Sequence, residues 1–124
     1  MPALDGKRIN ILQEMRHMLK GWIKLTELLG KSFSRGTLIR FPSSYPFENE
    51  VIMMVSEAPN GSGLCLITVT GYKAGINCYQ KFPESEVNLE TAADWLIQNW
   101  NKWIWPEGNV NDVLIHEALK PNDL

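Results

Sequence analysis

Two pairs of carboxylates are the first candidates for chemistry in this 124-residue sequence. Glu48 and Glu50 form one pair, and Glu84 and Glu86 form the other. On a strand, an i, i+2 spacing puts both carboxylates on one face, where they could serve general acid–base catalysis or hold a metal ion. Such pairs are more often exposed on a sheet edge, so we interpret them as contacts for a partner and not as catalytic groups.

The other residue types that catalyse reactions are scarce. His17 and His116 are the only histidines, and Cys65 and Cys78 are the only cysteines. Nucleophilic catalysis would require His116 to meet a serine or Cys78 in space, and no local sequence signature supports that. The cysteines lack the CxxC spacing of a metal or redox site, so we expect two reduced, buried side chains. We therefore predict no catalytic residue, no metal site and no cofactor.

Tryptophan is the second notable residue type. Four of the five tryptophans, Trp95, Trp100, Trp103 and Trp105, lie within eleven positions. They could form an aromatic platform for nucleotides or sugars, or they could fill the core of a small domain. Helical spacing favours the core for Trp95 and Trp103. Trp105 stands beside a proline at the end of the predicted helix, so we expect it to be exposed and available to a partner.

A turn framed by two glycines is the clearest local motif. An apolar, β-branched run ends at Gly71, and a second strand-like run, Ile76–Phe82, follows Gly75. Glycine supplies the positive φ that a tight reversal needs. We therefore predict a β-hairpin that presents Tyr72 and Lys73 at its tip.

Further apolar runs of strand length surround this hairpin. They are bounded by prolines, glycines and polar residues, as strands commonly are. The run at 51–55 is almost continuously apolar, which favours a central strand, whereas the run at 113–115 is expected at a sheet edge. Residues 27–36 are expected to form a loop. The predicted strands are Trp22–Thr26, Thr37–Phe41, Val51–Val55, Leu64–Thr70, Ile76–Phe82 and Val113–Ile115.

One helix is predicted in the C-terminal half. Thr91 and Asp94 resemble a capping box, which marks a helix start, and Pro106 would stop the helix. Its apolar face should lie on the sheet. The expected fold is α+β, a single domain with a mostly antiparallel, twisted sheet of about five or six strands covered by this C-terminal helix.

The first residues form a separate segment. The spacing of apolar residues predicts an amphipathic helix over 8–19. Gln13-Glu14 can be encoded by a ribosome-binding sequence shortly before Met18, so this N-terminal helical arm either precedes the natural start or is a genuine helix that packs on the core. The expected division is an N-terminal helical extension over 1–17, a domain over 18–120 and a tail over 121–124.

The charge of the chain is unevenly distributed. Residues 1–70 carry eight Lys and Arg against six Asp and Glu, and residues 71–124 carry four against eight. An acidic half suits a basic partner, although it is also ordinary surface charge, and the formal net charge of −2 disfavours direct nucleic-acid binding. No apolar run reaches the roughly 18 residues of a membrane span, and the N-terminus lacks the apolar stretch of a signal peptide. We expect a cytoplasmic protein with no membrane contact.

Several separated motifs, taken in order, are similar to those of a known family. They are Arg35-Gly36-Thr37, Phe41-Pro42-Ser43-Ser44, Pro46-Phe47-Glu48, Gly71-Tyr72-Lys73-Ala74-Gly75 and Asp94-Trp95-Leu96-Ile97-Gln98-Asn99-Trp100-Asn101-Lys102-Trp103. Over roughly Gly21 to Ile115 the chain resembles immunity proteins of bacterial contact-dependent growth inhibition and polymorphic-toxin systems, and among them immunity protein family forty-five.

The resemblance implies a non-enzymatic, cytoplasmic protein that binds and neutralises one cognate toxin. The toxin domain is expected to be a basic nuclease whose active or host-factor-binding surface is occluded, and the immunity protein is expected to be a monomer. The shared motifs should mainly build the scaffold. Two alternatives stay open, a small-ligand binding module that uses the Trp-rich helix and an enzyme that uses the carboxylate pairs or Cys78. The residues predicted for the toxin interface are Glu48, Glu50, Tyr72, Lys73, Glu84, Glu86, Asp94 and Trp105.

Overall fold

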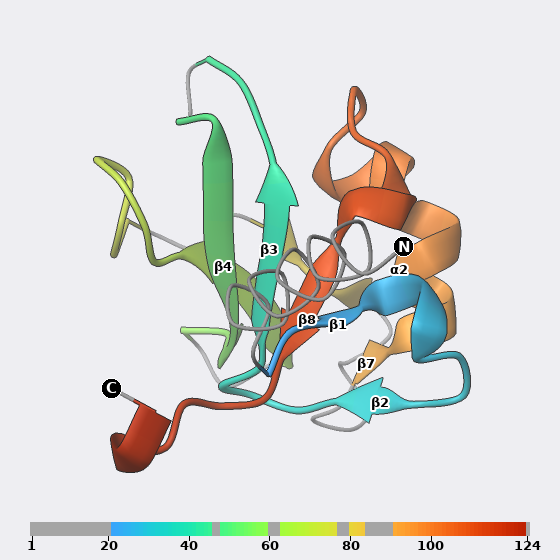
Figure 1. The fold of residues 1–124 in the computed structure, drawn as a ribbon, viewed down its shortest axis with the longest axis horizontal. Helices are drawn as coiled ribbons and strands as arrows, with labels where there is room; N and C mark the ends of the chain where they lie inside the picture. The colour runs from blue at the N-terminus through green and yellow to red at the C-terminus, as the bar shows by residue number, and fades with distance from the viewer. Residues whose placement is uncertain (1–20, 46–47, 60–62, 77–79, 84–90, 124) are drawn as a thin grey trace, which may run out of the picture.

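A six-stranded antiparallel sheet forms the centre of the fold (Figure 1). The computed structural model describes residues 21–45, 48–59, 63–76, 80–83 and 91–123. Within these residues the strand order is β1-β8-β3-β4-β5-β6, and one α-helix accompanies the sheet, so the predicted α+β class is confirmed. The strands of this sheet are Ile23–Lys24 (β1), Leu38–Pro42 (β3), Glu50–Glu57 (β4), Leu64–Thr68 (β5), Gln80–Lys81 (β6) and Leu114–His116 (β8).

The pairing of β3 with β4 sets the two faces of the sheet. The register runs from Leu38 opposite Met54 to Pro42 opposite Glu50. Because side chains alternate along a strand, Val51, Met53 and Val55 share the fully buried face, and the residues between them lie half-buried on the other face. The prediction of a central strand at 51–55 is therefore confirmed.

The helix covers the buried face of the sheet. α2 (Ala93–Asn99) continues directly into a π-helical turn, η3 (Trp100–Ile104). Leu96, Trp100 and Ile104 are fully buried and belong to the same hydrophobic core as the sheet residues. The predicted helix over 91–105 is thus present as 93–104, and its apolar face packs on the sheet as expected.

The tryptophans of this helix pack mainly against other aromatic rings. The Trp95 ring lies 5.8 Å from that of Phe82 and 5.4 Å from that of Trp103, both edge to face. The Trp100 ring meets the Phe41 ring edge to face at 4.9 Å. Edge-to-face packing is a favoured geometry for aromatic pairs, and it explains why a small core holds so many large rings.

The predicted capping box is wrong. Thr91 belongs to a short strand, β7 (Thr91–Ala92), which pairs with β2 (Ser32–Phe33) in a second sheet of two strands. Thr91 lies opposite Phe33 and is buried, so its hydroxyl is not at the helix N-cap, which is Ala92. The Asp94 carboxylate instead accepts a hydrogen bond from the Gly30 backbone N–H at 2.8 Å.

Four further expectations are corrected or narrowed. The segment expected as a loop at 27–36 contains β2, and the strand expected at 22–26 continues after β1 as a 3₁₀ turn, η1 (Leu25–Glu27). β8 is not an edge strand, because it pairs with both β1 and β3. The strand predicted over 76–82 is described only as β6, which pairs with Cys65 and Leu66, since residues 77–79 lie outside the described ranges.

Short 3₁₀ turns complete the C-terminal region, η4 (Val110–Asp112) before β8 and η5 (Pro121–Asp123) near the end of the chain. The helix expected over 8–19 falls outside the described residues. Among the residues that are described, no helix is both long enough and apolar enough to cross a membrane.

Candidate functional site

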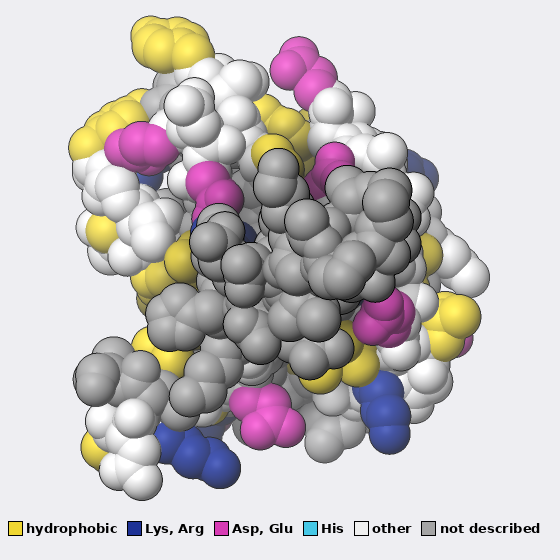
Figure 2. Space-filling view, viewed as in Figure 1, with side chains coloured by type: hydrophobic (Ala, Val, Ile, Leu, Met, Phe, Trp, Pro, Cys, Tyr) yellow, Lys and Arg dark blue, Asp and Glu magenta, His cyan; other side chains and the backbone are white. Residues whose placement is uncertain are grey.

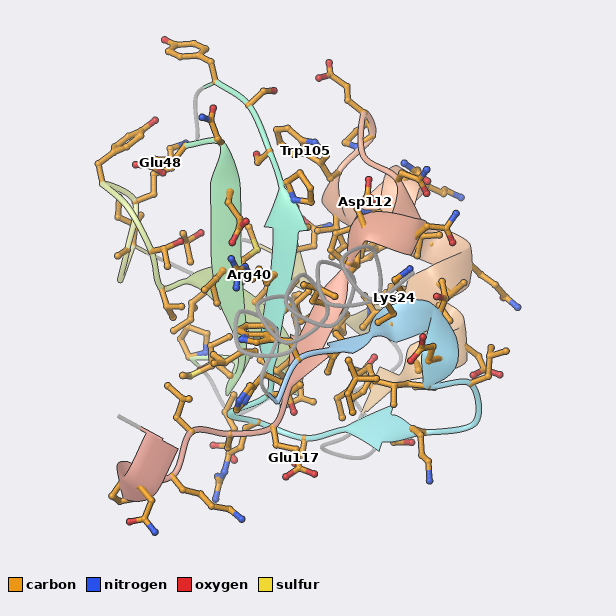
Figure 3. The ribbon with its side chains drawn as sticks, in the orientation of Figure 1. Lys24, Arg40, Glu48, Trp105, Asp112 and Glu117 are labelled. Atoms are coloured by element: carbon orange, nitrogen blue, oxygen red, sulfur yellow. The ribbon has the colours of Figure 1, made fainter. Side chains whose placement is uncertain are left out.

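The glycine turn brings three of the predicted interface residues together. Gly71 and Gly75 have φ values of +74° and +78°, which confirms the positive φ expected at both. The Glu48 carboxylate accepts a hydrogen bond from the Tyr72 backbone N–H at 3.1 Å and lies directly against Gly71. The Lys73 ammonium is 5.9 Å from the centre of the Tyr72 ring. Glu48, Tyr72 and Lys73 therefore form one surface, to which Glu48 comes from a different loop (Figure 3).

Glu50 takes a different partner from Glu48. Its carboxylate forms an ion pair with Arg40, which lies on the neighbouring strand β3. The Arg40 guanidinium carbon also lies 5.5 Å from the centre of the Trp22 ring. Glu48 thus holds the turn at Tyr72, and Glu50 pairs with Arg40. Because each carboxylate has its own partner, the two do not combine into a single acid–base site.

The remaining predicted interface residues are dispersed. Asp94 holds the loop at Gly30, whereas Glu48 holds the turn at Tyr72. Glu84 and Glu86 lie outside the described residues. The sequence predicts an exposed Trp105, but this ring is half-buried, as are Trp95 and Trp103. Trp105 nevertheless lines a pocket that the sequence patterns did not indicate.

This pocket has a volume of about 270 Å³ and lies between the end of β3 and the loop that follows η3. Its walls are formed by Phe41, Trp100 and Trp105, and acidic side chains border hydrophobic surface in this part of the molecule (Figure 2). Trp105 and Asp112 lie near each other beside the upper end of β3 in Figure 3. The complete lining is Phe41, Pro42, Ser43, Ser44, Trp100, Trp105, Glu107, Gly108, Asn109 and Asp112.

The π-helical turn shapes one wall of the pocket. The Trp105 backbone N–H donates to the Trp100 carbonyl at 3.1 Å, an i to i+5 bond that widens the last helical turn. The Asn101 side-chain amide donates to the carbonyls of Trp105, at 3.2 Å, and of Gly108. A Cβ at Gly108 would lie 2.6 Å from the Trp105 ring, so this loop passes too close for a larger residue.

Two buried polar atoms belong to side chains that line this pocket. Ser43 Oγ and Trp100 Nε1 are both inaccessible to solvent, and neither has a hydrogen-bond partner within the described part of the chain. Both residues line the pocket. Glu107 and Asp112 are exposed at its edge, and within the described ranges neither carboxylate is paired with a cation. The pocket thus combines an acidic rim with two polar atoms in its walls that have no hydrogen-bond partner among the described residues.

Cys65 and His116, the described residues that could support redox, metal or nucleophilic chemistry, make contacts outside the pocket. The Cys65 thiol is buried, as expected, and donates weakly to the Glu57 carbonyl at 3.8 Å, whereas Cys78 is not among the described residues. His116 Nδ1 lies 2.6 Å from the Glu117 carbonyl, and the His116 ring packs on Trp22. Within the described ranges, no group of three or more His, Cys, Asp or Glu side chains could hold a metal ion.

A pocket built from residues that lie about 60 positions apart, such as Phe41 and Trp105, leaves no spacing signal in the sequence. The motifs at 41–44 and 94–103 each contain part of it, but nothing local shows that they meet. The acidic residues of its rim are isolated in the sequence and resemble ordinary surface charge.

Comparison with known proteins supplies the family. The model of one family, described as Immunity protein 45, matches residues 25–115, a range that contains the whole pocket and the glycine turn. No curated protein and no solved structure matches the chain. Because the matched range covers well over half of the 124 residues, the chain belongs to the Immunity protein 45 family.

Proposed function

We propose that this protein binds a cognate toxin domain in the cytoplasm and neutralises it by covering the toxin's active or host-factor-binding surface. The observation that carries the proposal is the family match over residues 25–115, since immunity proteins as a class neutralise toxins. The protein acts by binding and not by catalysis. The system is a bacterial contact-dependent growth-inhibition or polymorphic-toxin system.

Exposed aromatic side chains support a binding role. Tyr45 is 92% exposed and Tyr72 is 63% exposed. Tyrosine and tryptophan are enriched among the residues that dominate interface energies, and large exposed rings on loops are therefore candidates for partner contacts. Glu48 fixes the turn that carries Tyr72, so this part of the surface is preorganised.

The charge distribution supports a basic toxin, and nuclease toxins are basic because they bind phosphates. Residues 71–124 have four more acidic than basic side chains. Opposite charges on two partners accelerate their encounter and select against wrong partners. Glu84 and Glu86 remain predicted contributors to this effect.

The test is co-expression of this chain with the toxin domain encoded immediately upstream of it. The expected result is cell survival, together with a stable complex on size-exclusion chromatography. A matched control is co-expression with a toxin domain from an unrelated system, which the protein should fail to neutralise. If both proteins are produced in soluble form and cells still die, the proposal is wrong for that toxin.

The alternative of a small-ligand binding module keeps one supporting observation. Trp95 packs against Trp103 and Phe82, and Trp100 packs against Phe41, which removes these rings from an open platform. The pocket beside Trp105 is the place where a ligand could still bind. Quenching of tryptophan fluorescence by nucleotides or sugars would favour this alternative.

A further inference from the structure

We propose that the pocket at the end of β3 receives a single arginine side chain of the toxin, together with the backbone carbonyl next to it. We call this pocket the β3 pocket. The inference rests on the proposed function, because it names the contact through which the toxin is held. The residues that bind the arginine and the adjacent carbonyl are Ser43, Trp100, Trp105, Glu107 and Asp112.

The interior of the β3 pocket requires a hydrogen-bond acceptor. Trp100 is only 1% exposed, and its indole Nε1 is a donor without a partner among the described residues. An indole nitrogen can donate but cannot accept, whereas the Ser43 hydroxyl can do either. Buried polar groups in proteins are nearly always hydrogen-bonded, so an unpartnered donor that lines a pocket points to a ligand that supplies the acceptor. A peptide carbonyl supplies it.

The rim of the β3 pocket favours a cation. The carboxylates of Glu107 and Asp112 stand at its edge, and within the described ranges neither has a cationic partner. The side wall is the Trp105 ring, whose face attracts cations. A guanidinium meets both requirements, because its planar donors pair with carboxylates in a bidentate manner and its flat surface stacks on aromatic rings.

The size of the β3 pocket selects a side chain over a larger ligand. Its volume of about 270 Å³ lies just below the range of roughly 300–1,000 Å³ that is usual for small-molecule and cofactor sites. Its walls are also held in place, since the Asn101 amide donates to carbonyls on either side of the loop tip. The rim and the Trp105 wall are thus preformed, and only the cover over Trp100 Nε1 has to open when the carbonyl enters.

The first experiment measures the affinity of the toxin domain for two double variants. Glu107→Gln with Asp112→Asn removes the rim charge and keeps the size of the side chains. Glu117→Gln with Asp123→Asn is the matched control, because it changes the net charge equally at the C-terminal segment, away from the pocket (Figure 3). We expect the dissociation constant to rise by about tenfold or more for the rim variant and by less than about twofold for the control. Equal affinities for the two variants would overturn the proposal while leaving the proposed function intact.

The second experiment does not depend on the toxin. Chain labelled with ¹⁵N is titrated with a capped glycyl-arginine peptide, and the indole N–H resonance of Trp100 is followed by NMR. We expect this resonance to shift with the arginine peptide, to shift less with the corresponding lysine peptide, and to stay in place in the rim variant. Unchanged resonances elsewhere in the spectrum show that the rim variant is folded.

The two experiments separate the possible failures. If the wild-type chain does not bind the toxin domain but the peptide shifts Trp100, the proposed function fails for that toxin and the β3 pocket stands as an arginine site. If the peptide leaves Trp100 unchanged, or shifts it equally in the rim variant, the arginine assignment is wrong. A shift produced by nucleotides or sugars instead of the peptide would also contradict it.

Discussion

At the scale of single residues, Arg40 combines an ion pair with a contact to an aromatic ring. Its side chain is 27% exposed, it pairs with Glu50 across the β3–β4 ladder, and it lies over the Trp22 ring. The chain also contains a second arginine–carboxylate pair, Arg35 with Glu57 at 2.5 Å, in which the arginine is 69% exposed. The two pairs differ mainly in how much water surrounds the cation.

Replacing each arginine by alanine should therefore have unequal effects. Arg40→Ala is expected to lower the free energy of unfolding by about 1–2 kcal/mol, because it removes a partly shielded ion pair, a cation–π contact and the packing of the aliphatic stem. Arg35→Ala is the matched control and should cost at most about 0.5 kcal/mol, since an exposed pair is screened by solvent. Urea unfolding followed by tryptophan fluorescence measures both. Equal losses would show that the contacts of Arg40 do not stabilise the fold.

At the scale of secondary-structure elements, the turn at 71–75 depends on both of its glycines, but for different reasons. At Gly75 the only obstacle to a side chain is the positive φ, because no described atom lies within 4 Å of where a Cβ would be. At Gly71 the φ is also positive, and a Cβ would in addition overlap with the Glu48 carboxylate.

This difference predicts that an alanine substitution costs more stability at Gly71 than at Gly75. Gly75→Ala should cost about 1–2 kcal/mol of stability, which is the usual penalty for a left-handed backbone at a non-glycine residue. Gly71→Ala should cost about 1 kcal/mol more, because Glu48 must move and lose its hydrogen bond to the Tyr72 N–H. Chemical denaturation measures each variant alone and combined with Glu48→Ala. In the Glu48→Ala background the two glycine substitutions should become nearly equivalent, and a persisting difference would refute the steric explanation.

At the scale of the whole molecule, the uneven charge is the property most relevant to finding a partner. The excess of acidic side chains lies in residues 71–124, whereas residues 1–70 are slightly basic. Long-range attraction of this kind acts on the encounter of two proteins and is screened by salt over a Debye length of about 10 Å at 0.1 M ionic strength. Short contacts inside the interface act instead on dissociation.

Reversing the charge at Glu84→Lys and Glu86→Lys should accordingly slow association with a basic toxin. The reduction in the association rate should be largest at low salt and should disappear as ionic strength rises, with little change in the dissociation rate. Stopped-flow mixing at several salt concentrations measures both rates. Glu27→Lys with Glu117→Lys gives the same change of net charge elsewhere. If this control slows association equally, the total charge and not these two residues steers the toxin.

Local features of the sequence predicted much of this fold correctly. The turn at Gly71 and Gly75, the strand at 51–55 and the apolar face of the helix follow from φ preferences and from side-chain periodicity, which act between near neighbours. The capping box at Thr91 and Asp94 failed for the opposite reason. Its residue types fit an N-cap, but Thr91 lies in β7 and pairs with Phe33 of β2, and Asp94 accepts from Gly30 about 60 positions away.

The sequence by itself thus determined the α+β class, the positions of most strands, the helix and the family, because each of these depends on patterns within short stretches of chain. Only the tertiary structure decided that β8 lies between β1 and β3, that Glu48 and Glu50 take different partners, and that Phe41 and Trp105 enclose a pocket. These features depend on which distant segments come into contact when the core is buried, and the spacing of residues along a single chain does not encode those contacts.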